Sequence, residues 1–163
     1  MSQTANADTA NRTFVMERIF SAPRELVFET FTNAEHLKNW YGPKDWTLPV
    51  SKLDLREGGS WNYCMQGPTG REMWGRADYH KIIPPEMLSY TESIVDKGGN
   101  VMQGMPQMHV TLSFEDLGDK TTKITNSIVF DTVQEFEMST KGGMSKGFEQ
   151  AYDSLDDLLK TLA

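Results

Sequence analysis

Two polar side chains, Glu92 and Asn126, stand on otherwise apolar faces of segments that alternate like β-strands. Glu92 is in phase with the apolar residues of 88–94, and Asn126 is in phase with those of 124–130. A buried polar group without a partner costs about 1–3 kcal/mol, so each must meet a protein partner or a ligand. Three interpretations of Glu92 are open: an acid or base with a raised pKa, a partner of a buried Arg or Tyr, or a strand register shifted by one residue.

Aromatic and methionine side chains dominate the same faces and one side of the last predicted helix. Such side chains suit an adaptable apolar pocket that contains a few polar groups. Together with the two polar residues they form the predicted ligand-binding set: Trp40, Trp61, Tyr63, Tyr79, Tyr90, Glu92, Val110, Asn126, Met144, Phe148 and Tyr152. The competing interpretation is that these residues fill a hydrophobic core, as most buried aromatic residues do.

A further aromatic group surrounds Gly42-Pro43, with Trp40 and Tyr41 before it and Trp46 after it. One interpretation is a cavity mouth that closes on a ligand. The other is that Trp40 only anchors a short helix to the sheet. The sequence favours neither.

No residue pattern identifies a catalytic centre, so the catalytic residues stay unknown and an enzyme is the less favoured class. The three histidines, His36, His80 and His109, lie on different predicted elements without metal-ligand spacing, so we predict neither a metal nor a cofactor. No glycine-rich phosphate loop joins a strand to a helix, and no nucleophile elbow is present. The single cysteine, Cys64, lies in a strand-like run and is interpreted as a small buried hydrophobe.

The elements that must position these residues follow from hydrophobic periodicity. A strand is predicted over 13–20, followed by two short helices. Pro23 suits the first turn of the first helix. Residues 32–35 have the form of a capping box for the second helix. Residues 50–130 alternate with period two, which indicates an antiparallel meander with one buried face. Residues 144–162 carry an apolar stripe at helical spacing. This stripe must cover the sheet, with the two short helices as a lid, so an α+β fold is expected.

Length and charge narrow the class of protein. The 163 residues fit one domain, and we predict a disordered N-terminal tail over 1–11 and a single domain over 12–163. The net charge of −7 disfavours nucleic acid and anionic membranes as partners. No apolar run reaches the roughly 20 residues of a membrane span, and the first residues lack the pattern of a secretory signal. With only one cysteine, these features predict a cytoplasmic protein without membrane insertion.

Five segments in this order resemble the activator of heat-shock-90 ATPase-like branch of the START-like (SRPBCC) superfamily. They are Ala22–Phe28 (APRELVF), Leu37–Pro43 (LKNWYGP), Arg56–Trp61 (REGGSW), Ile83–Leu88 (IPPEML) and Gly143–Phe148 (GMSKGF). The resemblance covers roughly residues 12–162. It implies a helix-grip fold, in which a curved antiparallel sheet wraps around the long C-terminal helix and leaves a cavity between them.

Function varies widely on this fold, so the resemblance leaves three classes open. The leading hypothesis is binding of a small apolar or aromatic ligand in the cavity, oriented by tyrosines, Glu92 and Asn126. The second is an enzyme of the cyclase, aromatase or dehydratase kind that uses Glu92 or a pocket Tyr. The third is a protein-interaction module related to stress or chaperones. Relatives often form dimers, which makes a homodimer possible.

Overall fold

The computed structural model describes residues 3–162, which form one eight-stranded antiparallel sheet and four helices. The order across the sheet is β1-β2-β8-β7-β6-β5-β4-β3. The strands are β1 (Gln3–Asp8), β2 (Thr13–Phe20), β3 (Thr47–Leu53), β4 (Ser60–Gln66), β5 (Glu72–Ile83), β6 (Met87–Val95), β7 (Gln107–Gly118) and β8 (Thr121–Phe130). The helices are α1 (Arg24–Thr32), α2 (Ala34–Trp40), α3 (Val133–Lys141) and α4 (Met144–Leu162).

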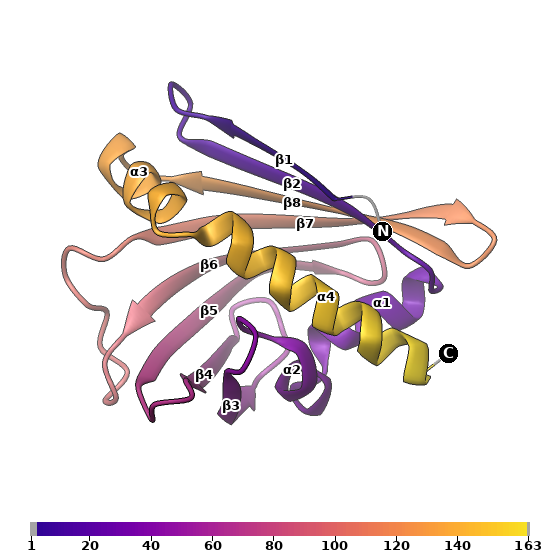
Figure 1. Ribbon diagram of the computed structural model, residues 1–163, viewed down its shortest axis with the longest axis horizontal. Helices are drawn as coiled ribbons and strands as arrows, with labels where there is room; N and C mark the ends of the chain where they lie inside the picture. The colour runs from indigo at the N-terminus through magenta and orange to yellow at the C-terminus, as the bar shows by residue number, and fades with distance from the viewer. Residues whose placement is uncertain (1–2, 163) are drawn as a thin grey trace.

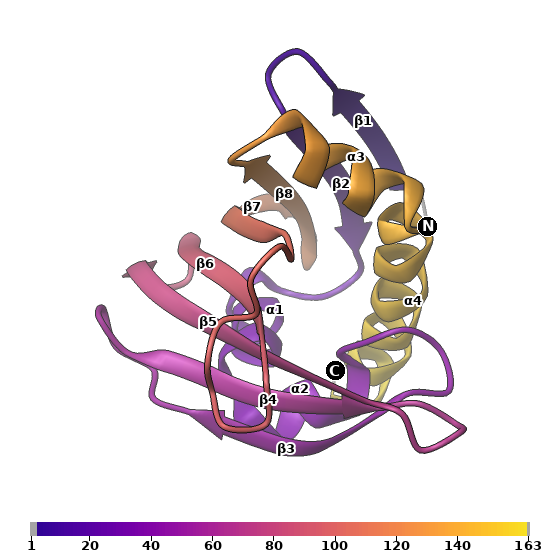
Figure 2. The ribbon, with the colours of Figure 1, turned by 90° about the vertical axis from the view of Figure 1, so that its left-hand side faces the viewer.

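The sheet is strongly curved, and α4 crosses its concave side (Figures 1 and 2). Register shifts between Tyr79 and Lys81 in β5, and between Asp116 and Gly118 in β7, interrupt the ladders. Such irregularities bend strands and increase their twist. The predicted α+β helix-grip architecture is therefore confirmed, including the two short helices that follow the strand over 13–20.

The long helix is held against the sheet by its apolar stripe and by one buried cation. Tyr152, Leu155 and Leu159 are buried against the sheet, as the helical spacing predicts. Arg18 on β2 is also buried and forms ion pairs with Asp153 at 2.8 Å and Asp156 at 2.7 Å on α4. These bonds compensate the desolvation of the guanidinium and fix the position of the helix.

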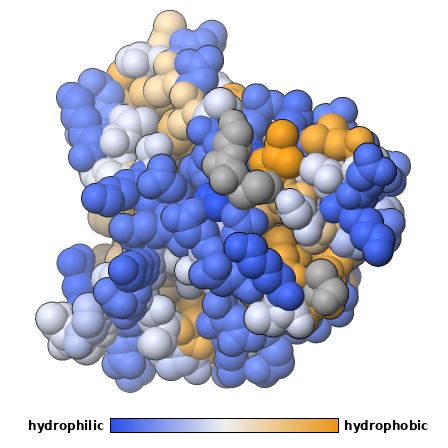
Figure 3. Space-filling model, turned by 45° about the vertical axis from the view of Figure 1, so that its right-hand side comes forward, coloured by the Kyte–Doolittle hydropathy of each residue, from blue (hydrophilic) through white to orange (hydrophobic). Residues whose placement is uncertain are grey.

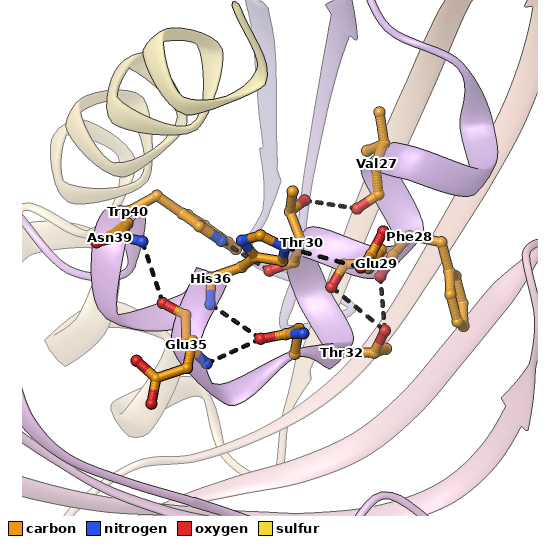
Figure 4. A network of polar contacts seen from close by, with 10 residues as sticks. Val27, Phe28, Glu29, Thr30, Thr32, Glu35, His36, Asn39 and Trp40 are labelled. Carbon is orange, nitrogen blue, oxygen red and sulfur yellow. Dashed lines mark hydrogen bonds and ion pairs between the residues drawn. The ribbon is translucent and has the colours of Figure 1, made fainter. Parts of the chain in front are cut away.

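The two short helices lie beside α4 (Figure 1). The N-cap of α2 is Asn33, whose Oδ1 accepts hydrogen bonds from the backbone N–H groups of Glu35 at 2.9 Å and His36 at 3.2 Å (Figure 4). The capping-box pattern at 32–35 is therefore displaced by one residue. Thr32 instead ends α1, and its hydroxyl donates to the carbonyl of Phe28.

Two elements differ from the sequence-based expectation. Instead of a disordered tail over 1–11, residues 3–8 form β1, an edge strand paired with β2 along its whole length; residues 1–2 lie outside the described part. The polar composition of β1 gives little strand propensity, but the free edge of β2 supplies backbone partners. Helix α3 was not predicted. Its signal is a capping box, in which the Thr132 hydroxyl accepts from the N–H of Glu135 at 3.0 Å.

Figure 3 shows one face of the molecule, on which hydrophilic side chains predominate and hydrophobic residues emerge in patches between them. The net charge of −7 agrees with this surface. No helix among residues 3–162 is long and apolar enough to cross a membrane.

Candidate functional site

A cavity of about 240 Å³ lies between the concave face of the sheet, α4 and the segment after α2. Sheet, helix and connecting segment therefore all contribute side chains to it. Its lining is predominantly apolar and aromatic: Phe31, Leu37, Trp40, Tyr41, Gly42, Pro43, Trp61, Met65, Ala77, Tyr79, Leu88, Tyr90, Leu112, Asn126, Met144, Gly147, Phe148, Ala151 and Tyr152.

Trp40 lines this cavity, which is the larger of the two described here, and it also anchors its own helix, α2. Its indole N–H donates to the backbone carbonyl of Thr30 at 2.8 Å, which joins the end of α2 to α1 (Figure 4). The ring also packs against Phe31, with centroids 4.7 Å apart. The two interpretations of Trp40 are thus compatible, except that the anchoring bond goes to α1 and not to the sheet. Trp46 lines neither this cavity nor the second one described below.

Asn126 is the one amide side chain in the lining of the larger cavity, and it is only 2% exposed. Its Nδ2 donates to the hydroxyl of Tyr152 on α4 at 3.4 Å. Its Oδ1 is buried and has no hydrogen-bond partner among the described residues. Burial also raises the pKa of Tyr152, so this phenol stays protonated at neutral pH. A buried acceptor without a partner, on a residue that lines a cavity, is a group with which a ligand hydroxyl or N–H could form a hydrogen bond.

A second cavity, of about 190 Å³, adjoins the first. Three residues, Tyr41, Met65 and Phe148, line both. The lining of the second cavity is Tyr41, Tyr63, Met65, Met73, Glu92, Ser93, Ile94, Pro106, Met108, Ser139 and Phe148.

Glu92, on β6, is the acidic residue of the second cavity and is 5% exposed. The hydroxyl of Tyr41 donates to its Oε2 at 2.6 Å, and the hydroxyl of Tyr63 donates to the same oxygen. Burial raises the pKa of Glu92, and the two phenolic hydrogen bonds oppose this by stabilising the carboxylate. Burial and the nearby carboxylate in turn raise the pKa of both phenols, which are therefore donors.

The phenol of Tyr63 can reach Glu92 because the neighbouring strand carries a glycine. Gly75 on β5 pairs with Tyr63 on β4, and a Cβ at position 75 would overlap the Tyr63 ring. On its other side Tyr63 stacks on Trp61, with ring centroids 4.2 Å apart. A glycine in a strand interior often marks such a close approach.

The structure divides the predicted ligand-binding residues between the two cavities. The larger cavity contains Trp40, Trp61, Tyr79, Tyr90, Asn126, Met144, Phe148 and Tyr152. The second cavity contains Tyr63, Glu92 and Phe148. Val110 is buried in the core and lines neither. Of the three interpretations of Glu92, pairing with a buried Tyr is the one that the hydrogen bonds support. Burial also raises its pKa, and the strand register was not shifted.

The sequence placed Tyr41 in a possible cavity mouth but did not reveal its contact with Glu92, because this contact spans 51 positions. Tyr41 stands at the C-cap of α2, and only the packing of that helix against the sheet places its hydroxyl near β6. The glycine and proline after it mark the end of the helix but do not indicate a partner.

The histidines form no metal site in the described residues, where no group of three His, Cys, Asp or Glu side chains could hold an ion. Two of them instead share one threonine on neighbouring strands. The hydroxyl of Thr91 lies 2.7 Å from Nε2 of His80 and 3.0 Å from Nδ1 of His109. Nε2 of His109 also lies 2.9 Å from Oδ1 of Asp131, and both of these side chains are about half exposed to solvent. His36 lies apart from them, on α2.

A curved sheet that grips a C-terminal helix around an internal cavity defines the chain as a helix-grip protein. A family model described as "Activator of Hsp90 ATPase homolog 1-like protein" matches residues 21–160, so the chain belongs to this family. No curated protein matches the chain.

Solved structures support the same architecture. A protein from Arthrobacter aurescens superposes with a TM-score of 0.91 at 23% identity, over 97% of this chain and 91% of that one. A protein from Staphylococcus epidermidis gives 0.85 at 26% identity, over 98% and 95%. An AHSA1 protein from Silicibacter pomeroyi gives 0.76 at 20% identity, over 93% and 99%. Identities this low establish the fold and leave the ligand to the site itself.

Proposed function

We propose that this protein binds a small apolar or aromatic molecule in the larger cavity, and that the ligand carries a hydroxyl or N–H group. The observation that carries the proposal is Asn126, which lines a predominantly apolar and aromatic cavity and whose Oδ1 is a buried acceptor without a partner among the described residues. A ligand donor would satisfy this atom, and the aromatic walls would desolvate the rest of the ligand at about 25 cal/mol per Å² of apolar surface.

The size of the cavity supports a ligand of one or two rings. Its volume is about 240 Å³. An engineered apolar cavity of about 150 Å³ in another protein binds benzene. The space therefore suits a molecule larger than benzene and smaller than a sterol. The net charge and the single buried cysteine support a small-molecule partner, rather than nucleic acid, and a reducing cytoplasmic setting.

The first experiment is native mass spectrometry of the protein purified from its own host, compared with its denatured mass. A retained mass difference would give the class of the natural ligand. In parallel, binding of 1-naphthol, a bicyclic molecule with one hydroxyl, is measured by titration calorimetry.

Two variants on α4 control the location of binding. Ala151 lines the larger cavity, so Ala151→Leu fills part of it, whereas Thr161→Leu places the same leucine side chain at an exposed position of the same helix. We expect Ala151→Leu to remove 1-naphthol binding and Thr161→Leu to retain it. Equal binding by both variants would place the ligand elsewhere and refute the proposal.

A further inference from the structure

The second cavity differs chemically from the first, because it contains a carboxyl group. Glu92 is the only acid that lines it, and no Lys, Arg or His of the described residues shares the lining. The titratable groups that face Glu92 are the phenols of Tyr41 and Tyr63, with Tyr79 and Tyr90 close enough to be influenced by its charge. The carboxylate of Glu92 therefore meets no compensating cation from the described protein.

The hydrogen bonds of Glu92 are unevenly distributed between its two oxygens. Both phenols donate to Oε2, and Oε1 receives no hydrogen bond from the described residues. A carboxylate has acceptor capacity on both oxygens. Because Tyr41 and Tyr63 hold Oε2, the orientation of the group is fixed and Oε1 is the oxygen left to accept a bond.

The rest of the second cavity is lined by soft and aromatic groups. Thioether groups come from Met65, Met73 and Met108. Aromatic rings come from Tyr41, Tyr63 and Phe148. Aromatic rings attract cations through their quadrupole, and methionine side chains adapt to irregular apolar ligands. Carboxylate, aromatic rings and thioethers together suit a compact organic cation better than they suit an anion or a neutral polar molecule.

We propose that the second cavity is a separate binding site for a small amine in its ammonium form, whose N–H donates to Oε1 of Glu92 while its apolar part contacts the methionines and Phe148. The site does not depend on the function proposed for the larger cavity. An ion pair formed away from water is favourable only with good geometry and additional bonds, and the two fixed phenols provide these. Without Glu92 a buried ammonium would meet only weak cation–π attraction.

The protonation of Glu92 couples amine binding to pH. Burial raises the pKa of Glu92, and an ammonium ion favours its ionised form. Amine affinity is therefore expected to rise as the pH increases through this pKa, with release of a proton on binding. A neutral ligand in the same site would show no such rise.

The test is titration calorimetry with benzylamine and, as its uncharged match, benzyl alcohol, from about pH 5 to about pH 8, where the amine remains protonated. On the wild-type protein we expect benzylamine to bind at least tenfold more tightly than the alcohol at the upper end of this range. Glu92→Gln should weaken benzylamine by about ten- to a hundredfold, as expected for loss of a hydrogen bond to a charged group, and should remove the pH dependence. Thermal unfolding of the variant verifies that it is folded.

Two filling variants assign binding to one of the two cavities. Ser139 on α3 lines only the second cavity, and Ala151 lines only the first. We expect Ser139→Leu to weaken benzylamine and spare 1-naphthol, and Ala151→Leu to do the reverse. Equal affinity for amine and alcohol on the wild-type protein, no amine binding at millimolar concentration, or amine binding lost in Ala151→Leu alone would each overturn the inference. The results with the wild-type protein and the two filling variants can be interpreted even if Glu92→Gln does not fold. Failure of 1-naphthol to bind would refute only the function proposed for the larger cavity.

Discussion

Replacing Tyr63 with Phe removes one of the two phenolic donors to Glu92 and keeps the aromatic ring that stacks on Trp61. The variant therefore isolates a hydrogen bond rather than a packing interaction. Because its acceptor is titratable, the cost of losing the bond should depend on pH. This dependence distinguishes a bond to a carboxylate from general damage to the core.

The magnitude follows from the charge of the acceptor. A hydrogen bond to a charged group contributes about 1.5–3 kcal/mol, and a neutral one about 0.5–1.5 kcal/mol. Tyr63→Phe should therefore destabilise the protein by about 1–2 kcal/mol more when Glu92 is ionised than when it is protonated. Burial raises the folded-state pKa of Glu92 above the ordinary value of 4.5, and loss of the Tyr63 hydrogen bond raises it further. The cost of Tyr63→Phe should therefore rise as the pH passes the folded-state pKa of the wild type, and level off above the higher folded-state pKa of the variant.

The sign for Glu92 itself is opposite to that of most native carboxylates. A group whose pKa is raised on folding binds its proton more tightly in the folded state, so stability is lost as the pH rises. Relative to Glu92→Gln, the wild-type protein should lose at most about 1.4 kcal/mol per pH unit between 4.5 and the folded-state pKa. Above this window the difference should be constant.

The assay is urea denaturation at a series of pH values, with the free energy of unfolding compared between wild type, Tyr63→Phe and Glu92→Gln. The matched control is Tyr79→Phe, because Tyr79 is also buried near Glu92 but makes no hydrogen bond to it. If Tyr63→Phe and Tyr79→Phe show the same pH dependence, or if wild type gains stability over Glu92→Gln as the pH rises, the reasoning about this cluster is wrong.

Three further predictions, two of them with a control substitution, test the sheet, the helix and the larger cavity. Asn126→Leu should keep the free energy of unfolding within about 1 kcal/mol of wild type, because it removes an unpaired acceptor. The same substitution should weaken the affinity for 1-naphthol, measured by calorimetry, by up to about tenfold. Arg18→Met should cost about 1–3 kcal/mol in urea denaturation, since one of its two aspartates is mostly exposed. Lys123→Met, whose ion pairs are more exposed to solvent, should cost less in the same assay; equal costs would contradict the role given to the buried arginine. Gly75→Ala should lower stability by about 1–3 kcal/mol, because the added methyl group displaces the phenol of Tyr63. Gly147→Ala should raise stability by about 0.5–1 kcal/mol, because there is open space around this position within its helix. Both changes are measured by thermal unfolding.

The fold was largely predictable because its main elements carry strong periodic patterns. The stripe on α4 requires an apolar surface of matching length, and the meander over 50–130 provides the only large one. The predictions failed where local pattern is weak: the polar strand β1 forms because β2 offers an unpaired edge, and α3 is short with a single buried residue, Phe136.

The site was predictable in composition but not in arrangement. Strand parity placed Glu92 and Asn126 on the inner face, since side chains of a strand alternate between faces without exception unless a bulge intervenes. Parity alone does not state how far apart two inward residues lie along the curved sheet. For this reason one expected cavity became two, with Asn126 in one and Glu92 in the other.

Five short segments of the amino-acid sequence indicated the family. Its periodicity, which depends on local spacing, predicted the order of the main elements and the inward position of Glu92 and Asn126, but not the burial of Arg18. Only the tertiary structure decided which partners those residues meet. The bonds from Tyr41 and Tyr63 to Glu92 join residues 51 and 29 positions apart, and the unpaired oxygen of Asn126 results from the packing of α4 over β8. Such contacts depend on sheet curvature and helix placement, which are properties of the whole packed molecule.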